Sequence, residues 1–252
     1  MDIVIIGTGN SATILGKKLK QAGHQILQVF GRNAAKASEL AYELDSVSTN
    51  YSSTLNKEAD LYLVAVSDNA IIQVLKELPL PSSTLVHTAG SVSKDVLKPF
   101  SKHYGVFYPL QSLKRGVSDT TDIPIVIDAS DPSTRHLLQT IGRSISSMVV
   151  EADDEKRLKL HLAAVFCNNF VNHIYTLMEQ YCAREGLDFH MLVPLIQETG
   201  KRLSQAAPGY SQTGPAIRRD TETLNRHLSL LDDQPYLKEI YRLFTESIQR
   251  YH

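Results

Sequence analysis

Residues 1–150 alternate short apolar, β-branched runs with amphipathic stretches. The runs predict strands over residues 3–7, 26–30, 61–66, 84–88, 105–110, 123–128 and 147–150. The stretches between them predict helices over residues 11–22, 34–44, 69–77, 93–101 and 131–143. The early strands lack apolar/polar alternation, which is expected when helices cover both faces of a parallel sheet. The pattern therefore predicts an α/β fold with a doubly wound, mostly parallel sheet.

The pattern changes after residue 150, because no strand is predicted over residues 156–252. Residues 155–183 are apolar on nearly every face, so we expect a long helix that is buried within its own domain or against a partner chain. A second helix is predicted over residues 188–205, with Asp188 as its N-cap and a kink at Pro194. A loop over 208–216 and helices over 220–231 and 235–250 follow. We therefore predict two domains, residues 1–150 and an all-α domain of residues 151–252.

Composition narrows the classes of partner. The 252 residues carry a formal net charge of −1, which disfavours nucleic acid and anionic membrane surfaces as partners. No apolar run approaches the roughly 20 residues of a membrane span, and no secretory signal precedes the first strand. We expect a cytoplasmic protein. Cys167 and Cys182 lack CxxC spacing and are expected to be core thiols, so no metal site is predicted.

A glycine motif follows the first predicted strand. The sequence GTGNSA, residues 7–12, has the form G-x-G-x-x-A and opens a helical pattern. Gly7 permits a tight turn, Gly9 lets the backbone approach a pyrophosphate, and Ala12 allows close packing of helix and strand. The helix N-terminus then offers N–H groups to the anion. Thr8, Asn10 and Ser11 complete the predicted loop of a Rossmann-like dinucleotide site.

The second strand ends in VFGRNA, residues 29–34, without the carboxylate that would bind the ribose 2′-hydroxyl of NAD. Arg32 stands about where that carboxylate would be, and its guanidinium suits a phosphate. Gly31 and Asn33 flank it, and Lys36 lies one turn further. These residues predict NADP(H) as the cofactor; a solvated turn arginine is the alternative.

Two further turns should lie along the cofactor, because ligands bind beyond the carboxyl ends of the strands in such sheets. The predicted contacts there are Val66, Ser67 and Asp68, then His87, Thr88 and Gly90. His87 could donate a proton or could be structural.

Several motifs together resemble one bacterial family. They are IVIIGTGN, GRN, AVSD, HTAGS, YPLQSL, HLAAVFCNNF and QTGPAIRRD. The family joins a Rossmann-like domain to a C-terminal domain of unknown function and is described as NADP oxidoreductases. More distantly the chain is similar to pyrroline-5-carboxylate reductase, ketopantoate reductase and the 6-phosphogluconate and β-hydroxyacid dehydrogenases. The resemblance implies NADP, an active site beside the first long helix of the all-α domain, and a homodimer through the C-terminal helices.

Candidate substrate residues interrupt the apolar surface of the long helix. His161, Asn168 and Asn172 fall on one stripe of a regular helix, with Asn169 beside it. Reduction of a carbonyl or imine needs a proton as well as hydride, and a histidine titrates near pH 6.5, so His161 is the candidate donor. Asn168 or Asn169 would orient the substrate. An internal hydrogen-bond network is the alternative reading of the stripe.

Other candidates lie outside that helix. Thr213 and Arg218 could hold a substrate carboxylate, unless the arginine braces Asp220, and Gln111 could face the cleft. Tyr108 stands where the family resemblance leads us to expect a histidine. The lysine that the dehydrogenase relatives carry four residues before an asparagine is Ala164 or Val165 here.

The preferred hypothesis is an NADP-dependent oxidoreductase that reduces a small C=N or C=O substrate between the two domains, in the manner of pyrroline-5-carboxylate reductase. The missing lysine disfavours hydroxyacid chemistry. The alternative is a non-catalytic NADP(H)-binding sensor or regulatory module. A nucleic-acid regulator is disfavoured because no basic patch is present.

Overall fold

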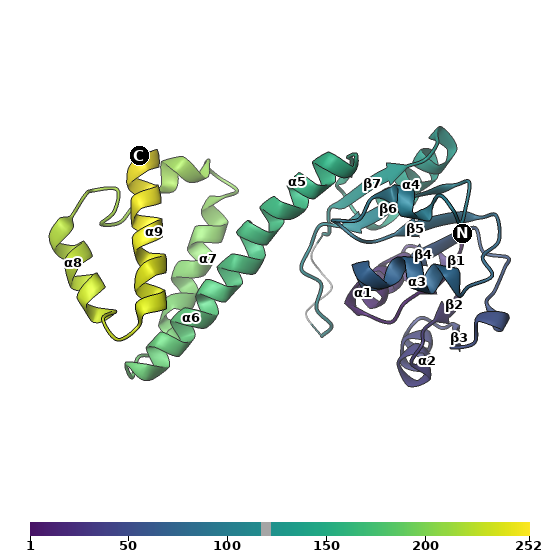
Figure 1. Cartoon of the computed structure of the whole chain (residues 1–252), viewed down its shortest axis with the longest axis horizontal. Helices are drawn as coiled ribbons and strands as arrows, with labels where there is room; N and C mark the ends of the chain where they lie inside the picture. The colour runs from purple at the N-terminus through teal and green to yellow at the C-terminus, as the bar shows by residue number, and fades with distance from the viewer. Residues whose placement is uncertain (117–121) are drawn as a thin grey trace. The chain divides into compact units, whose positions relative to one another are not determined.

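In this computed structural model, residues 1–116 and 122–252 are described. The chain divides by its internal packing into two units, Met1–Phe170 and Val171–His252 (Figure 1). The first unit contains a single eight-stranded sheet, and the second is helical throughout. None of the helices within the described ranges is long and apolar enough to cross a bilayer.

The sheet has the strand order β3-β2-β1-β4-β5-β6-β7-β8. Its strands are β1 Asp2–Ile6, β2 Gln25–Phe30, β3 Val47–Thr49, β4 Leu61–Val64, β5 Thr84–His87, β6 Tyr104–Pro109, β7 Ile125–Ala129 and β8 Val149–Glu151. All neighbouring pairs are parallel except β6 and β7, which are antiparallel. The predicted α/β fold with a mostly parallel sheet is confirmed. The short edge strand β3 was not predicted.

Helices cover both faces of this sheet, as Figure 1 shows. The helices of this unit are α1 Asn10–Gln21, α2 Ala34–Glu43, α3 Ile71–Lys76, α4 Pro132–Ile145 and α5 Asp154–Ala164. Apolar residues of α1, α2 and α4 pack with one set of strand residues, including Ile3 and Ile5. Residues of α3 pack with the alternate set, including Val4 and Ile6. The strands are apolar on both sides because each side meets a helix.

The helix predicted over residues 93–101 is wrong, because only a 3₁₀ turn, Lys94–Leu97, forms there. Pro99 has no amide hydrogen to continue a helix. Ser93 caps the short turn by accepting a hydrogen bond from the Asp95 backbone N–H.

Beyond the sheet, α5 is followed by a π-helical turn, Val165–Phe170, and the second unit begins with α6 Val171–Arg184. The remaining helices are α7 Val193–Arg202, α8 Thr221–Leu230 and α9 Pro235–Tyr251. Asp188 caps a 3₁₀ turn, Phe189–Leu192, that precedes α7. The predicted kink at Pro194 is wrong, since this proline lies in the first turn of α7, where a missing N–H leaves no bond unmade.

Burial differs from expectation on α5 and the π-helical turn. Leu158, Leu162 and Phe166 are 51%, 58% and 60% exposed in the single chain. The apolar side chains of α5 and the π-helical turn are therefore not buried in the single chain, and burial of the long helix against a partner chain stays a prediction. Of the two cysteines, Cys182 is buried as expected, whereas Cys167 is exposed.

Candidate functional site

The glycine turn between β1 and α1 has the geometry that its sequence predicts. Gly7 has φ +128°, and a Cβ at this position would lie 2.2 Å from the Ala65 carbonyl oxygen, so only glycine fits. Its backbone N–H donates to the Phe30 carbonyl oxygen at 2.8 Å. Gly9 is the N-cap of α1, and no side chain in the described part of the chain caps this helix. A Cβ at Gly9 would meet no atom of residues 1–116 or 122–252 within 4 Å, so these residues leave the helix N-terminus open to an anion.

A cavity of about 680 Å³ opens at this turn and runs along the carboxyl ends of the strands. Its volume lies in the range of ligand-binding clefts. The predicted cofactor residues that line it are Gly7, Thr8, Gly9, Asn10, Ser11, Gly31, Arg32, Asn33, Val66, Ser67, Asp68 and Thr88. The cavity thus follows the switch point of the sheet, between β1 and β4, where such folds bind nucleotides.

Two of the predicted cofactor residues do not line this cavity. His87 is fully buried: its Nδ1 accepts a hydrogen bond from the Ala89 backbone N–H, and its Nε2 lies 3.3 Å from the Ser93 carbonyl oxygen. Burial lowers the pKa of His87 to about 4, so the ring is neutral and supports the loop that follows β5. Gly90 belongs to that loop and packs against Tyr108 and His161 instead.

The cavity wall beyond β2 carries the cations that favour a phosphate. Arg32 and Lys36 are exposed and line the cavity, and Asn33 joins them. The Asn33 side chain also caps α2 by accepting a hydrogen bond from the Lys36 backbone N–H at 3.0 Å. The nearest acid, Glu39, lies further along α2 with its Oε1 atom 3.8 Å from Nη1 of Arg115. The lining residues fit a nucleotide with a phosphate on its ribose.

Arg115 is a contact that the sequence did not predict. Its Nε donates to Thr13 Oγ1 at 2.7 Å and its Nη2 to the Thr8 carbonyl oxygen at 3.0 Å. The segment after β6 is thereby fixed to the glycine turn, and Gln111 and Leu113 of this segment line the cavity. No local motif marks such a contact, because the bonded residues lie 102 and 107 positions apart.

A second cavity of about 210 Å³ adjoins the first. Its lining includes Leu110, Ser112, Ala164, Val165, Asn168 and Asn169. Tyr108, Gln111 and His161 line both cavities and so mark the junction between them. At this junction the Tyr108 Oη atom lies 2.9 Å from His161 Nδ1, and the two rings pack edge to face with centroids 5.8 Å apart.

The structure therefore brings together only some of the predicted substrate residues. His161, Gln111, Asn168 and Asn169 meet at the two cavities. Asn172, Thr213 and Arg218 belong to the second unit, and their part in the substrate site stays a prediction. The prediction of Asn172 assumed a regular helix. The π-helical turn Val165–Phe170 rotates the chain less per residue, since its bonds span five positions instead of four.

Asp220 accepts hydrogen bonds from the backbone N–H and the hydroxyl of Thr223 at the start of α8. Asp220 is therefore the N-cap of α8. This structural role is close to the alternative prediction, in which Arg218 braces Asp220 instead of binding substrate. These hydrogen bonds, with smaller contributions from the charges of Arg218 and Arg226, lower the pKa of Asp220.

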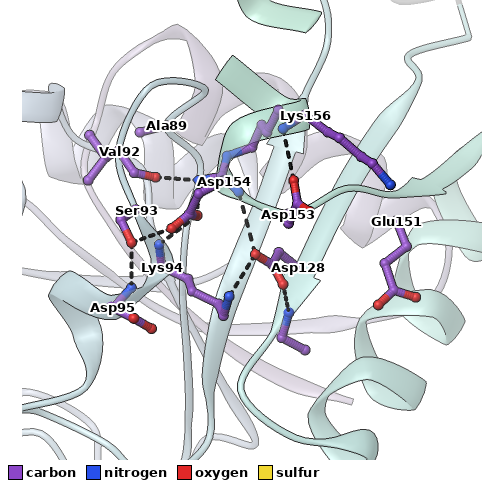
Figure 2. A network of polar contacts seen from close by, with 12 residues as sticks. Ala89, Val92, Ser93, Lys94, Asp95, Asp128, Glu151, Asp153, Asp154 and Lys156 are labelled. Atoms are coloured by element: carbon purple, nitrogen blue, oxygen red, sulfur yellow. Dashed lines mark hydrogen bonds and ion pairs between the residues drawn. The ribbon is translucent and has the colours of Figure 1, made fainter. Parts of the chain in front are cut away.

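A partly buried polar network, centred on Arg157, joins the loop after β5 to the first turn of α5 (Figure 2). Arg157 is 1% exposed and donates through Nη2 to the Val92 carbonyl oxygen at 2.5 Å and to Asp154 at 2.6 Å. Asp154 also accepts from the Ser93 hydroxyl and the Lys94 backbone N–H, and Lys94 Nζ pairs with Asp128 at 3.0 Å. His161 lies one turn of α5 beyond Arg157, so this network holds the helix of the site against its loop.

Asp154 remains a carboxylate in this network. Burial alone would raise the pKa of Asp154, but hydrogen bonds from Ser93, Arg157 and Lys94 together lower it below its ordinary value. Asp154 therefore keeps its negative charge beside the buried guanidinium of Arg157, which needs a counter-charge.

Two families match the chain. Residues 2–90 match the family described as NADP oxidoreductase coenzyme F420-dependent, and residues 123–248 match the domain of unknown function DUF2520. The sequence has no match among curated proteins. The second family begins at β7, so it includes the last two strands of the sheet as well as the helical part.

Solved structures with the same fold include enzymes. A candidate NADP oxidoreductase from Bacteroides fragilis is 38% identical, with a TM-score of 0.92 over 99% of this chain and 98% of that one. Pyrroline-5-carboxylate reductase from Streptococcus pyogenes has 14% identity and a TM-score of 0.68 over 99% and 98% of the two chains. An imine reductase from Myxococcus stipitatus in complex with NADP⁺ has 14% identity and a TM-score of 0.62 over 99% and 92%.

The pyrroline-5-carboxylate reductase and the imine reductase share only the fold with this chain, whereas the Bacteroides fragilis protein is also similar in sequence. The glycine turn, the cations beyond β2 and the matched families agree on NADP as the cofactor. The chain belongs to the family of NADP oxidoreductases whose C-terminal part is the domain of unknown function DUF2520.

Proposed function

We propose that the protein reduces a small C=N or C=O substrate with NADPH, at the junction of the two cavities. The observation that carries this proposal is that Tyr108, Gln111 and His161 line both the large cavity at the glycine turn and the small one beside it. A cofactor in the first cavity and a substrate in the second would meet there. NADPH, when bound, supplies the hydride.

The chain's own residues divide the remaining work. Arg32, Lys36 and the N-terminus of α1 would bind the phosphates, and Asn168 and Asn169 would orient the substrate through their amides. His161 would supply the proton that accompanies hydride transfer. The pyrroline-5-carboxylate and imine reductases with this fold supply the analogy for the class of substrate.

The first test concerns cofactor choice and uses Arg32→Ala. Loss of a charge-assisted hydrogen bond to the 2′-phosphate is worth about 1.5–3 kcal/mol, so NADPH affinity should fall about ten- to hundred-fold. NADH, which lacks this phosphate, should bind about equally to the variant and the wild type. Calorimetric titration with each nucleotide measures both, and Arg143→Ala, an exposed arginine on α4, is the matched control. Equal losses for the two nucleotides would reject the phosphate contact.

The second test concerns the reaction. Oxidation of NADPH should be followed at 340 nm with a panel of cyclic imines and 2-oxoacids, and reduction of one member supports the proposal. Preferential NADPH binding without oxidation in the presence of any member would instead favour the non-catalytic NADP(H)-binding module.

We also propose that the protein works as a homodimer. Leu158, Leu162 and Phe166 follow one another at four-residue intervals on α5 and the π-helical turn, and each is more than half exposed in the single chain. Leu158 and Leu162 share one face of α5, and Phe166 follows in the π-helical turn. Large apolar side chains exposed close together in this way are typical of an association surface. The partner that the family resemblance implies is a second copy of the chain.

A further inference from the structure

Tyr108 was not among the predicted site residues, yet its hydroxyl makes the hydrogen bond to His161 at the junction of the two cavities. Tyr108 lies on β6 and His161 on α5, so two separate elements present the pair. The bond uses Nδ1 of the imidazole ring. Only Nε2 then remains to exchange a proton with a substrate.

The hydroxyl of Tyr108 stays neutral at physiological pH. Its side chain is buried, and burial is the main cause that raises its pKa above the ordinary value of 10.0; the charge of Asp68 acts in the same direction and that of Arg157 in the opposite one. A neutral hydroxyl can accept a hydrogen bond from a protonated ring nitrogen. It therefore suits an imidazolium, whose two nitrogens both carry hydrogen.

We propose that Tyr108 is a positioning residue: by accepting a hydrogen bond from Nδ1–H it keeps that proton in place and leaves Nε2 of His161 as the atom that protonates the substrate. This inference rests on the proposed function. A histidine acts as a directed acid only when the other nitrogen is fixed by a second group, because that bond determines the tautomer and the ring orientation.

The proton and electron balance of the step is complete. The substrate carbon takes hydride from the nicotinamide, and the electron pair of the C=O or C=N bond takes the proton from Nε2. The products are an alcohol or amine, NADP⁺ and a neutral His161 that still carries hydrogen on Nδ1 and still donates it to Tyr108. Water then returns a proton to Nε2. Such a donor serves a carbonyl or an unprotonated imine, because an iminium needs no further proton.

The packing around the pair supports a fixed geometry. A Cβ built at Gly90 would lie 2.8 Å from both His161 Nδ1 and Tyr108 Cζ, so the backbone of the loop covers the hydrogen bond directly. Arg157 ties this loop to α5 through the Val92 carbonyl oxygen. The loop therefore blocks one side of the pair, and neither ring can move toward Gly90 without displacing it.

The proposal is tested by the ring-nitrogen signals of His161 in two-dimensional ¹H–¹⁵N NMR spectra of labelled full-length protein, assigned with His161→Gln. In the wild type, the neutral ring should carry its hydrogen on Nδ1. In Tyr108→Phe, which removes the acceptor and little else, a substantial share of the hydrogen should move to Nε2. Tyr104→Phe is the matched control, since Tyr104 lies on the same strand and its hydroxyl bonds Asp95 instead. Hydrogen on Nε2 of the neutral wild-type ring would overturn the proposal.

Kinetics then separate this inference from the proposed function. With a 2-oxoacid of the panel, or with a cyclic imine at a pH where that imine is unprotonated, Tyr108→Phe should lower kcat about ten- to hundred-fold, with KM and NADPH affinity within about twofold of the wild type. An unchanged kcat would overturn the positioning role while leaving the reductase intact. The expected tautomer together with no turnover of any panel member would sustain the role of Tyr108 in fixing His161 and reject the reductase.

Discussion

The buried histidine at the end of β5 should make the fold sensitive to mild acid. His87 has no exposed surface, and its neutral ring accepts from the Ala89 N–H at Nδ1 and lies against the Ser93 carbonyl oxygen through Nε2. A proton on Nδ1 would break the first of these bonds and place a charge in the core. Burial, opposed in part by the bond to Ser93, accordingly lowers the pKa of His87 from 6.5 to about 4.

The size and sign of the effect follow from proton linkage. The folded state binds the proton more weakly than the unfolded state, so stability is complete above the unfolded pKa of 6.5 and is lost as the pH falls toward 4. At about 1.4 kcal/mol per pKa unit, the difference between the two pKa values corresponds to about 3 kcal/mol. That is a large part of the stability of an ordinary domain.

The perturbation that isolates this effect is His87→Gln, because an amide retains hydrogen-bonding capacity and does not titrate in this range. The free energy of unfolding should be measured by urea titration with circular dichroism from pH 7.5 to 4.5, for the wild type and the variant. The wild type should lose about 2–3 kcal/mol more than the variant over this interval. His136→Gln, at an exposed position on α4, is the matched control and should follow the wild type. Parallel curves for wild type and His87→Gln would refute the reasoning.

Two further predictions concern the site and the assembly. Gly90→Ala places a methyl group 2.8 Å from His161 Nδ1, so the Tyr108–His161 hydrogen bond should break and the His161 tautomer should change in the NMR spectrum. Gly209→Ala is the control and should leave the tautomer unchanged, because a Cβ there meets no described atom within 4 Å. An unaltered tautomer in Gly90→Ala would contradict the packing. In analytical ultracentrifugation, Leu162→Glu combined with Phe166→Glu should convert the dimer to a monomer. Ile72→Glu, at an exposed apolar position on α3, is the control and should leave the protein dimeric. A wild type that sediments as a monomer at micromolar concentration would refute the dimer.

The sheet was predictable because its information is local. The central strands are mainly apolar, and their residues pack with helices on both faces of the sheet. The edge strand β3 carries no such signal, because Val47–Thr49 is short, largely exposed and paired with β2 alone among the described strands. The 3₁₀ turn at Lys94–Leu97 was missed although the sequence does carry a signal there, because Pro99 disfavours a longer helix.

The lining of the large cavity was predictable for a related reason. The glycine turn and Arg32 follow their strands within a few positions, and the carboxyl ends of parallel strands meet at one edge of a sheet. Arg115 escaped this logic because it reaches the glycine turn from a segment more than a hundred positions away. His87 was misplaced because a residue that ends a strand can point either toward the cavity or into the core, and its sequence neighbours do not distinguish the two.

The substrate side depended on helix geometry that the sequence does not reveal. A regular helix places Asn172 on the stripe of His161, whereas the π-helical turn Val165–Phe170 intervenes and the cavity is lined by Asn168 and Asn169. Such turns often occur at functional sites because they change which side chains face a ligand. The role of Tyr108 could not be predicted from the sequence either. A tyrosine at a position where the family resemblance leads us to expect a histidine suggests a loss of function. Its hydroxyl instead meets a histidine on another element, and a hydrogen-bonding group on β6 is thereby kept at the junction where the proposed reaction requires one.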